Sequence, residues 1–293
     1  MRETAADRAF GVAVYVILSI VLVIILYPLV FVASASISDP LTVLRGDMWL
    51  FPTKISFVGY ERIFSNPEIL AGYANTILYT VVGTAINLVM TILAAYPLSR
   101  RDFAGRQVIT WFIVFTMFFS GGLIPSYLLV KDLGLINTMW ALILPGAVSV
   151  WNIIIMRTFF QTSIPAEVQE SAAIDGCSNI QTLLRIVLPL SMPIIAVMVL
   201  FYAVGHWNSY FNALIYLNDR EKYPLQLFLR EILIKSEVDQ MAGSMTASTQ
   251  TYLMETEAIK YAIVIVANLP VLMLYPFLQK YFVKGMLIGA IKG

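Results

Sequence analysis

The sequence predicts an all-α integral membrane protein with six transmembrane helices. Of its 293 residues, 59% are hydrophobic and only 13% are charged, and the mean hydropathy is +0.79. Such values are typical of a chain that lies largely within lipid. Six long stretches contain no Asp, Glu, Lys or Arg. Each approaches or exceeds the roughly 20 apolar residues that a helix needs to cross a bilayer.

The six charge-free stretches are residues 9–38, 69–99, 107–130, 133–156, 186–218 and 261–279. Because the bilayer interior offers no water to unpaired backbone groups, we predict helices even where Val and Ile are frequent. The first stretch has no small-residue cleavage site in the usual place, which favours a retained helix over a signal peptide. The chain is therefore expected to form one membrane domain over residues 1–293, with excursions at 39–68 and 219–260.

Prolines are expected to bend several of these helices, because each frees a carbonyl group one turn back. They are Pro28, Pro97, Pro125, Pro145, Pro270 and Pro276. Gly121-Gly122, which precedes Pro125, is the weakest point and is expected to end the third span or bend it. Kinks of this kind suit hinges in a transporter and are equally compatible with a static anchor.

The distribution of Lys and Arg predicts the orientation. Arg100, Arg101 and Arg106 lie in the short connection after the second span, whereas Lys131 alone lies in the connection after the third. Positive residues accumulate on the cytoplasmic side of short loops. The connection at 100–106 and both termini are therefore predicted to be cytoplasmic, and the same parity places residues 157–185 there.

The polar break between the fourth and fifth spans is predicted to contain a short exposed helix. Pro165 suits a first helical turn, and Glu167 and Glu170 lie near the N-terminal end, where the helix dipole favours anions. Gly176 is a plausible stop, because it accepts a left-handed backbone. Small residues in this helix allow another backbone to approach closely. By itself, this pattern also fits an ordinary interfacial helix between two spans.

The order of residues in this break is specific. Glu170-Ser171-Ala172-Ala173-Ile174-Asp175-Gly176 is followed by Ile186-Val187-Leu188-Pro189. This resembles the EAA signature of the permease subunits of ABC importers, with Ser171 standing where the family usually has its first Ala. The resemblance implies the type I importer permease fold, in which a cytoplasmic coupling helix docks into a separate ATPase. The expected docking residues are Glu170, Ser171, Ala172, Ala173, Asp175, Gly176, Ile186, Leu188 and Pro189. We call residues 165–190 the coupling segment.

Three further stretches resemble the carbohydrate-type permeases, and most closely their branch for oligosaccharides and polysaccharides. They are residues 94–100, residues 205–217 followed by 223–226, and residues 275–285. This resemblance covers nearly the whole chain. It implies a heterodimer with a second permease subunit, two ATPase subunits that hold ATP and Mg²⁺, and an external binding protein that delivers the sugar. It also implies the bacterial cytoplasmic membrane. An ABC importer for a different solute is the alternative.

A route for sugar needs flat apolar faces for the pyranose rings and amide or hydroxyl groups for the sugar hydroxyls. The fifth span offers both, because at helical spacing Asn208 and Asn212 share one face with Gly205, and Trp207 and Phe211 share a neighbouring one. The candidate residues for the substrate path are Trp207, Asn208, Tyr210, Asn212, Asn152 and Asn87. The aromatic residues equally suit an interfacial belt, and the Asn residues equally suit bonds between helices. The identity, length and charge of the sugar are not encoded here.

Other polar residues in the spans allow two interpretations. Thr80, Thr84, Asn87 and Thr91 stack along one helical face and either line a pore or bond within the helices. His206, the single histidine, is expected to be a packed and hydrogen-bonded ring. Cys177, the single cysteine, is expected to be a small residue tolerated beside Gly176, because it has no partner thiol.

Several other functions lack the residues that they need. No Gly-x-x-x-x-Gly-Lys-Ser/Thr occurs, so the chain offers no phosphate-binding loop of its own, and ATP is expected only on partner subunits. An intramembrane enzyme would need a nucleophile with a base or a histidine cluster for a metal, and neither pattern occurs. No basic patch with interleaved aromatic residues suggests nucleic acid.

Overall fold

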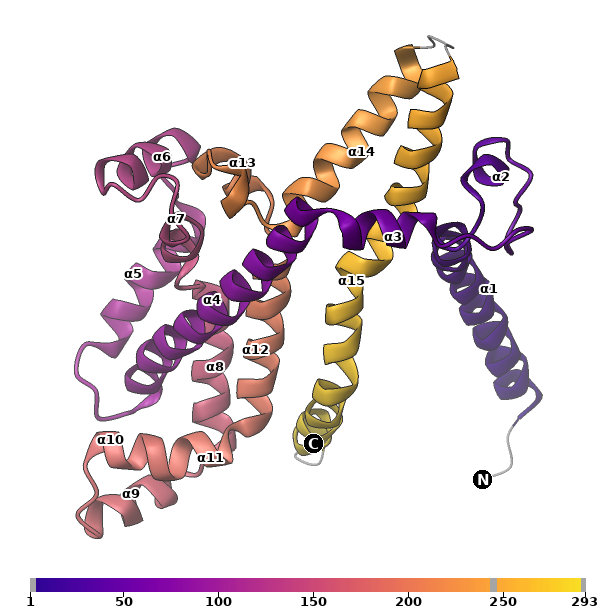
Figure 1. Ribbon diagram of the computed structural model, residues 1–293. Helices are drawn as coiled ribbons and strands as arrows, with labels where there is room; N and C mark the ends of the chain where they lie inside the picture. Colours follow the sequence, from indigo (N-terminus) through magenta and orange to yellow (C-terminus); the bar gives the residue numbers. More distant parts are fainter. Residues whose placement is uncertain (1–3, 243–246, 291–293) are drawn as a thin grey trace. The chain divides into compact units, whose positions relative to one another are not determined.

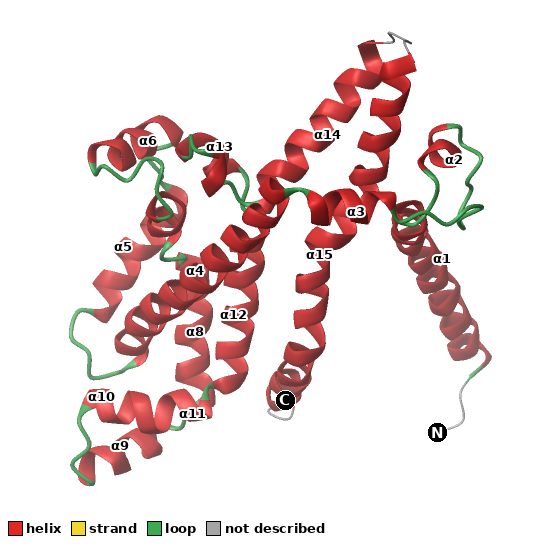
Figure 2. Cartoon of the chain, viewed as in Figure 1, coloured by secondary structure: helices red, strands yellow, loops and turns green. Residues whose placement is uncertain are grey.

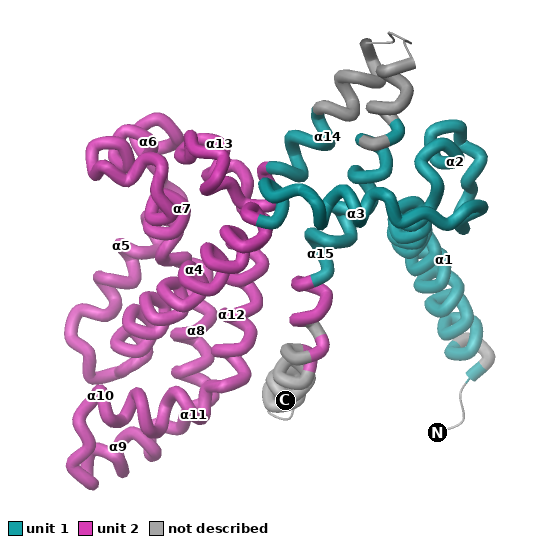
Figure 3. Tube along the Cα trace, viewed as in Figure 1, with its two compact units in different colours: residues 1–70, 228–269 teal, residues 71–227, 270–293 magenta. Residues whose placement is uncertain are grey.

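The computed structural model describes residues 4–242 and 247–290. Within these ranges the regular structure is helical, apart from one isolated antiparallel bridge between Ser38 and Ile55 (Figures 1 and 2). The predicted all-α class is therefore confirmed. The chain divides into two compact units, residues 1–70 with 228–269 and residues 71–227 with 270–293 (Figure 3). A single domain over residues 1–293 stays a prediction.

The first unit gathers the N-terminal helices and the hairpin near the C-terminus. Its helices are α1 (Ala5–Ser36), α2 (Pro40–Leu44), α3 (Val58–Ser65), α14 (Leu225–Ala242) from Phe228 on, and α15 (Ala247–Ala290) up to Leu269. Phe31 of α1 contacts Tyr261 of α15 edge to face, with 6.0 Å between ring centroids. Tyr60 of α3 shares a 2.9 Å hydrogen bond with Ser36 of α1. These contacts join α1, α3 and α15.

The second unit holds most of the predicted spans and the coupling segment. Its helices are α4 (Pro67–Ser99) from Ala71 on, α5 (Arg106–Phe118), α6 (Leu123–Asp132), α7 (Trp140–Ile143), η1 (Leu144–Gly146), α8 (Val150–Ser163), α9 (Ala166–Ile174), α10 (Asn179–Thr182), η2 (Leu183–Val187), α11 (Leu188–Leu190), α12 (Met192–Trp207), α13 (Phe211–Tyr216), η3 (Arg220–Lys222) and the part of α15 from Pro270 on. Within this unit, α9, α10 and α11 lie at the end opposite to α6 and α13 (Figure 1).

Three of the six predicted spans are single helices, and three are bent. Asp7–Ser36, Pro67–Ser99 and Thr256–Leu274 are each long and apolar enough to cross a bilayer. The other three predicted spans are long and apolar enough only when two helices on either side of a short break are taken together. These pairs are Arg106–Phe118 with Leu123–Asp132, Trp140–Gly146 with Val150–Ser163, and Asn179–Leu190 with Met192–Trp207. The pairs bend by 111°, 52° and 83°. The bent pairs correspond to the predicted spans 107–130, 133–156 and 186–218, of which the first was expected to end or bend at Gly121-Gly122. Six crossings result only if each bent pair is one span.

Local chemistry explains these bends. Gly122 has φ +83°, a conformation that side chains disfavour, and it ends the break between α5 and α6 as the Gly-Gly pair predicts. Residues 133–139 form a connection rather than the start of a span, and Pro145 lies in the turn before α8. At the third bend, Ser191 ends α11 and Pro193 lies in the first turn of α12. An apolar composition sets the length of a span but not its direction.

The main core of the second unit joins α4, α8, α12 and both flanks of α9. The buried residues of this core are Ala95, Tyr96, Leu98, Ile153, Met156, Phe160, Ile164, Leu183, Val187, Ile194, Met198 and Tyr202. Ile164 precedes α9, and Leu183 and Val187 follow it. The exposed helix α9 is thus carried on two flanks that are packed against the spans.

Candidate coupling segment and candidate substrate path

The predicted short helix is present as α9, which begins after Pro165 and ends at Ile174. Its end is closed by two backbone hydrogen bonds. Gly176 N–H donates to Ala173 at 3.1 Å, and Cys177 N–H donates to Ala172 at 2.9 Å. This pattern is the Schellman motif, which needs a left-handed residue after the helix. Gly176 supplies it with φ +78°, so the predicted stop at Gly176 is confirmed.

The surface of α9 is acidic and partly apolar. The exposed members of the predicted docking set in this helix and its end are Glu170, Ser171, Ala173, Asp175 and Gly176, whereas Ala172 is buried. Ile174 is 86% exposed and Ile180, just beyond, is 70% exposed. Two large apolar side chains beside carboxylates form a surface of the kind that binds a protein partner.

The second part of the signature produces a distorted turn rather than the start of a straight span. Leu188 N–H donates to the carbonyl of Leu183, five residues back, so residues 183–187 form a π-helix. Pro189 has no N–H to donate and its ring crowds the preceding turn, which favours this wider turn. Ile186 and Leu188 are half-buried and Pro189 is exposed. Between α9 and α12 the chain passes through this π-helix and α11 and then bends by 83° at Ser191.

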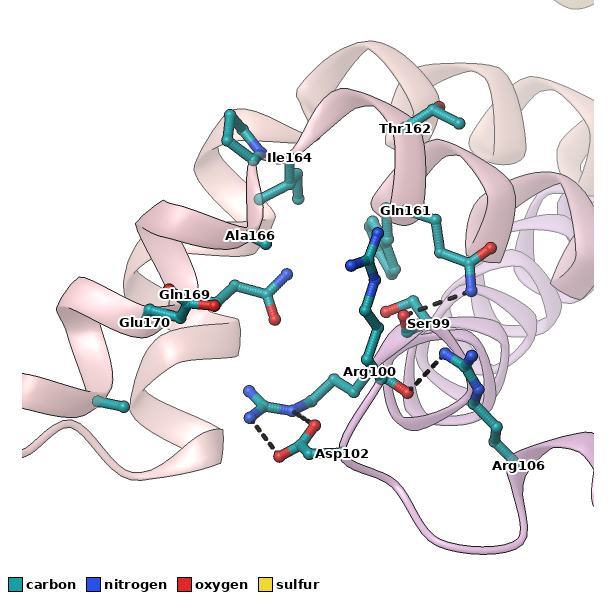
Figure 4. Close-up of a pocket in the computed structure, with 14 residues that line it drawn as sticks. Ser99, Arg100, Asp102, Arg106, Gln161, Thr162, Ile164, Ala166, Gln169 and Glu170 are labelled. Atoms are coloured by element: carbon teal, nitrogen blue, oxygen red, sulfur yellow. Dashed lines mark hydrogen bonds and ion pairs between the residues drawn. The ribbon is translucent and has the colours of Figure 1, made fainter.

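A cavity of about 650 Å³ lies between the coupling segment and the connection that follows α4 (Figure 4). The connection contributes Ser99, Arg100, Arg101, Asp102 and Arg106, and the other wall includes Gln161, Pro165, Gln169 and Glu170. The two segments therefore lie at the same end of the helices of the second unit, and their place on the cytoplasmic side stays a prediction.

The guanidinium of Arg100 is already occupied. It donates to both carboxylate oxygens of Asp102, at 2.8 and 2.7 Å, and to the Tyr96 hydroxyl at 3.2 Å. The hydrogen bonds with Asp102 raise the pKa of Arg100 above its ordinary value, and they lower the pKa of Asp102. This pair closes the turn after α4, so it is a structural element of the connection.

The C-terminal end of the fifth span differs from its prediction. The helix α12 ends at Trp207, Asn208 is its C-terminal cap, and a new helix starts at Phe211. Asn208 and Asn212 therefore do not share the face of one helix, because the cap bond of Asn208 closes α12. The Asn208 amide donates back to Val204 at 3.0 Å, and its oxygen accepts from Gln226 at 3.4 Å.

The candidate path residues differ in their exposure. Asn208 and Tyr210 are exposed, and Asn212 is half-buried. Trp207 is only 5% exposed, and its ring meets Tyr73 of α4 edge to face at 5.7 Å. Asn152 is buried in α8. The roles of all of them in a substrate path stay predictions.

Asn87 joins three elements of the second unit. Its amide nitrogen donates to the Gly146 carbonyl in η1 at 2.5 Å, and its oxygen lies 2.7 Å from His206 Nε2 in α12. Because the oxygen faces the ring, the His206 Nε2 carries the shared proton when the ring is neutral. The prediction of a packed, hydrogen-bonded histidine is confirmed. Asn87 itself is 1% exposed, so it could contact a substrate only if the surrounding helices moved apart.

The threonines on the same face of α4 are buried as well. Thr91 shares a 2.6 Å hydrogen bond with the Tyr202 hydroxyl of α12. The hydroxyls of Thr80 and Thr84 are buried and have no hydrogen-bond partner among the described residues. In this conformation the stripe therefore packs against other helices, which favours the packing interpretation over pore lining.

Comparison with known proteins decides the family. No family model matches the chain. The polygalacturonan/rhamnogalacturonan transport system permease protein YtcP of Bacillus subtilis is 44% identical over 287 residues, which cover 98% of this chain and 99% of that protein. A crystal structure of a bacterial ABC transporter involved in the import of the acidic polysaccharide alginate matches with a TM-score of 0.87 and 34% identity, covering 96% of this chain and 99% of that chain. The chain belongs to the family of ABC transporter permeases.

The family membership confirms the resemblance on which the sequence-based prediction rests. The permease is a transporter subunit with apolar helices and the fold of an ABC importer permease. A second structure, of a bacterial alginate ABC transporter in complex with an alginate pentasaccharide-bound periplasmic protein, matches with a TM-score of 0.57 at 15% identity, over 93% of each chain. At this identity the second match supports the fold alone.

Sequence reasoning missed Asn137 of the permease, which organises the loop after α13. Its side-chain oxygen accepts from the N–H groups of Asn218 and Asp219 at 3.1 Å each, and its amide donates to the Asp219 carboxylate at 2.7 Å. Lys222 donates to the Asn137 carbonyl at 3.0 Å and to Asp219 at 2.8 Å. The pKa of the Asp219 carboxyl group is lowered, mainly by its hydrogen bond from Lys222 and then by its hydrogen bond from Asn137. Asn137 is also a non-glycine residue with positive φ, at 62°, and a lone Asn carries no such signal in a sequence.

Proposed function

We propose that this permease is the membrane-spanning subunit of an ATP-driven importer that translocates an oligosaccharide or polysaccharide. The observation that carries the proposal is the exposed helix α9, whose two flanks are buried in the core with α4, α8 and α12. A partner that moved α9 would therefore move packed spans. Glu170, Ser171, Ala172, Ala173, Asp175 and Gly176 form the proposed docking helix, and Ile186, Leu188 and Pro189 form its return to the membrane.

The energy and the substrate come from other chains in this proposal. Two ATPase subunits hold ATP and Mg²⁺, a second permease completes the pore, and an external binding protein delivers the sugar. The permease lies in the bacterial cytoplasmic membrane with both termini in the cytoplasm. Support for this orientation comes from the arginines at 100–106, which line the same cavity as the coupling segment.

The substrate class in this proposal is an acidic oligosaccharide or polysaccharide. The relative YtcP is a polygalacturonan/rhamnogalacturonan permease, and the matching crystal structure is of an importer for the acidic polysaccharide alginate. Asn208, Tyr210 and Asn212 at the outer end of α12 and α13 are the proposed sugar contacts of this chain. Trp207 is buried and packed against Tyr73, so we assign it a supporting position.

Two measurements test the proposal. The first identifies, by mass spectrometry, the ligand that the external binding protein carries when it is purified. The second measures the uptake of that ligand in a strain that lacks the permease gene and in the same strain with the gene restored. Retention and uptake of uronic acid oligosaccharides support the proposal. Uptake of a neutral sugar with no uronide uptake refutes the acidic class, and unimpaired uptake without the permease refutes the transport role.

The Glu170→Lys variant tests the coupling role. Reversing this exposed charge is expected to leave membrane insertion intact and to lower both uptake and substrate-stimulated ATP hydrolysis, because Glu170 faces the proposed partner. The matched control is Glu221→Lys, an exposed acid at the opposite end of the second unit. If Glu170→Lys transports at the wild-type rate, residues 165–190 are an ordinary connection.

A further inference from the structure

The C-terminus of α4 is held by side chains from two other elements. The last carbonyls of a helix have no partner within the helix and need donors from elsewhere. Two of them are satisfied locally, because Ser99 Oγ donates to Tyr96 at 2.6 Å and Arg100 N–H donates to Pro97 at 3.1 Å. The next three accept from side chains that are more distant in sequence, and two of these side chains belong to α8.

The distant donors are Arg157, Gln161 and Arg106. Arg157 Nε donates to the Leu98 carbonyl at 3.0 Å, and Gln161 Nε2 donates to the Ser99 carbonyl at 3.4 Å. Arg106 donates to the Arg100 carbonyl at 3.2 Å. Figure 4 shows Gln161 and Arg106 directed at the end of α4. We call the two bonds from α8 the α4–α8 clamp.

The clamp has the geometry and charge of a firm connection. Arg157 and Gln161 are one helical turn apart and therefore project from the same face of α8. Arg157 is half-buried and forms no ion pair with a carboxylate in the part of the chain that the structure describes. Its charge is instead balanced by the negative end of the α4 dipole, and a charged donor makes the stronger kind of hydrogen bond.

The position of the clamp relates it to coupling. The helix α8 ends at Ser163, and only Ile164 and Pro165 separate it from α9. In the other direction, α4 carries Asn87, which is bonded to η1 and to His206 of α12. The clamp is thus a polar connection between α8, which leads into the coupling segment, and α4, which is hydrogen-bonded to η1 and α12.

We propose that Arg157 and Gln161 are positioning residues for transport, which make α4 follow α8 when the docked coupling segment moves. This inference rests on the proposed coupling role of α9. Without the clamp, only the apolar contacts of the main core connect α4 to α8, so α4 follows the movement of α8 less closely. ATP is then hydrolysed without a matching movement of the pore, so that the clamp sets the amount of ATP consumed for each sugar imported.

The test uses the intact transporter, with its partner permease, ATPases and binding protein, reconstituted in liposomes. Arg157→Met and Gln161→Leu remove the donors, Arg157→Lys keeps a charged donor, and Thr158→Val is the control. Thr158 lies on α8 but donates to Ile154 of its own helix at 2.8 Å. We expect ATP consumed per imported sugar to rise by about 2- to 30-fold in the first two variants, the range of coupling energies at single positions. Arg157→Lys should recover part of this loss, and Thr158→Val should match the wild type.

Two results would overturn the inference. One is a wild-type ratio of ATP to sugar in both Arg157→Met and Gln161→Leu. The other is a parallel loss of uptake, ATP hydrolysis and subunit copurification in both variants, which would make the clamp a purely structural contact. Because Gln161 lies at the exposed end of α8, its variant is expected to fold even if Arg157→Met does not. The ratio of ATP to sugar is measured with whichever sugar the wild type imports. Because Glu170→Lys tests the coupling role of α9 separately, the experiments distinguish an error in the clamp inference from an error in the proposed function.

Discussion

Gly176 and Asn137 both adopt left-handed backbone conformations, with φ of 78° and 62°, but for different reasons. At Gly176 this conformation ends α9, and no other atom would lie within 4 Å of an added Cβ. Glycine is therefore needed at position 176 because of the backbone conformation, not because a side chain would clash with a neighbour. At Asn137 the same conformation directs both the side chain and the carbonyl at the loop of residues 217–223. Asn tolerates this region better than other residues with a Cβ, because its short side chain can bond locally.

The Gly176→Ala variant is expected to weaken the end of α9 and lower uptake. A left-handed alanine costs about 1–2 kcal/mol, which would favour conformations in which Cys177 and Ala172 no longer bond. Hydrogen exchange at Cys177 and sugar uptake measure the two effects. The control is Gly146→Ala, because that glycine also has open space at its Cβ position but no positive φ. Equal hydrogen exchange in wild type and Gly176→Ala would contradict the conformational account.

The variants Asn137→Gly and Asn137→Ala separate the two roles of Asn137. Glycine keeps the backbone conformation but loses the side-chain bonds, whereas alanine loses both, so alanine should loosen the loop more. We expect amide hydrogen exchange at Asn218 and Asp219 to be faster in both variants and fastest in Asn137→Ala, by about tenfold for each 1.4 kcal/mol lost. An order in which glycine is worse than alanine would show that the backbone conformation is not strained.

At the scale of elements, the sequence predicts where helices occur better than it predicts how they bend. The predicted span over 69–99 agrees with α4 at Pro67–Ser99, because a charge-free stretch bounded by polar residues defines a buried length. The short helix ending at Gly176 was also predictable, because its stop has a local chemical signal. The end of α12 at Trp207 was not, because no Gly or Pro lies between His206 and Phe211 to mark it. The α4–α8 clamp joins residues 59 and 62 positions apart, and no local pattern records such pairs.

Close helix contacts give a prediction about two glycines. A Cβ at Gly59 of α3 would lie 2.3 Å from the Ala258 carbonyl oxygen of α15, and one at Gly83 of α4 would lie 2.5 Å from His206 Nε2. The Ala258 carbonyl near Gly59 belongs to the backbone and cannot move aside easily, whereas the His206 ring near Gly83 is a side chain and can rotate away. Both variants to alanine should lower the free energy of unfolding, by about 1–3 kcal/mol or more, with Gly59→Ala the worse. Gly205→Ala, with open space around its Cβ, is the control.

Removal of the His206 ring refines this prediction. The double variant Gly83→Ala with His206→Ala should be less destabilised than the sum of the single variants, because the clash disappears with the ring. Unfolding of the purified permease in detergent, followed with increasing denaturant, provides the measurement. Additive effects would mean that the alanine at position 83 is accommodated without touching His206.

At the scale of the molecule, the permease joins the exposed helix of the coupling segment to a polar network within the spans. The helix α9 is exposed, its flanks lie in the main core, and the same core holds α4 and α12. From α4, Asn87 extends the connection to His206 near the outer end of α12. A displacement at one end of the second unit thus reaches its other end through packed and hydrogen-bonded residues rather than through a flexible linker.

This arrangement predicts that the permease is inactive alone. The sequence contains no phosphate-binding Gly-x-x-x-x-Gly-Lys-Ser/Thr loop, and in the proposed function separate ATPases supply the energy and a second permease completes the pore. Liposomes that contain the permease with the ATPases but without a second permease should show no ATP-dependent uptake of the sugar. Adding the second permease should restore uptake, while Glu170→Lys in the complete assembly should lower it again. Full uptake by the permease and ATPases alone would show that two copies of this chain form the pore, and it would refute the proposed heterodimer.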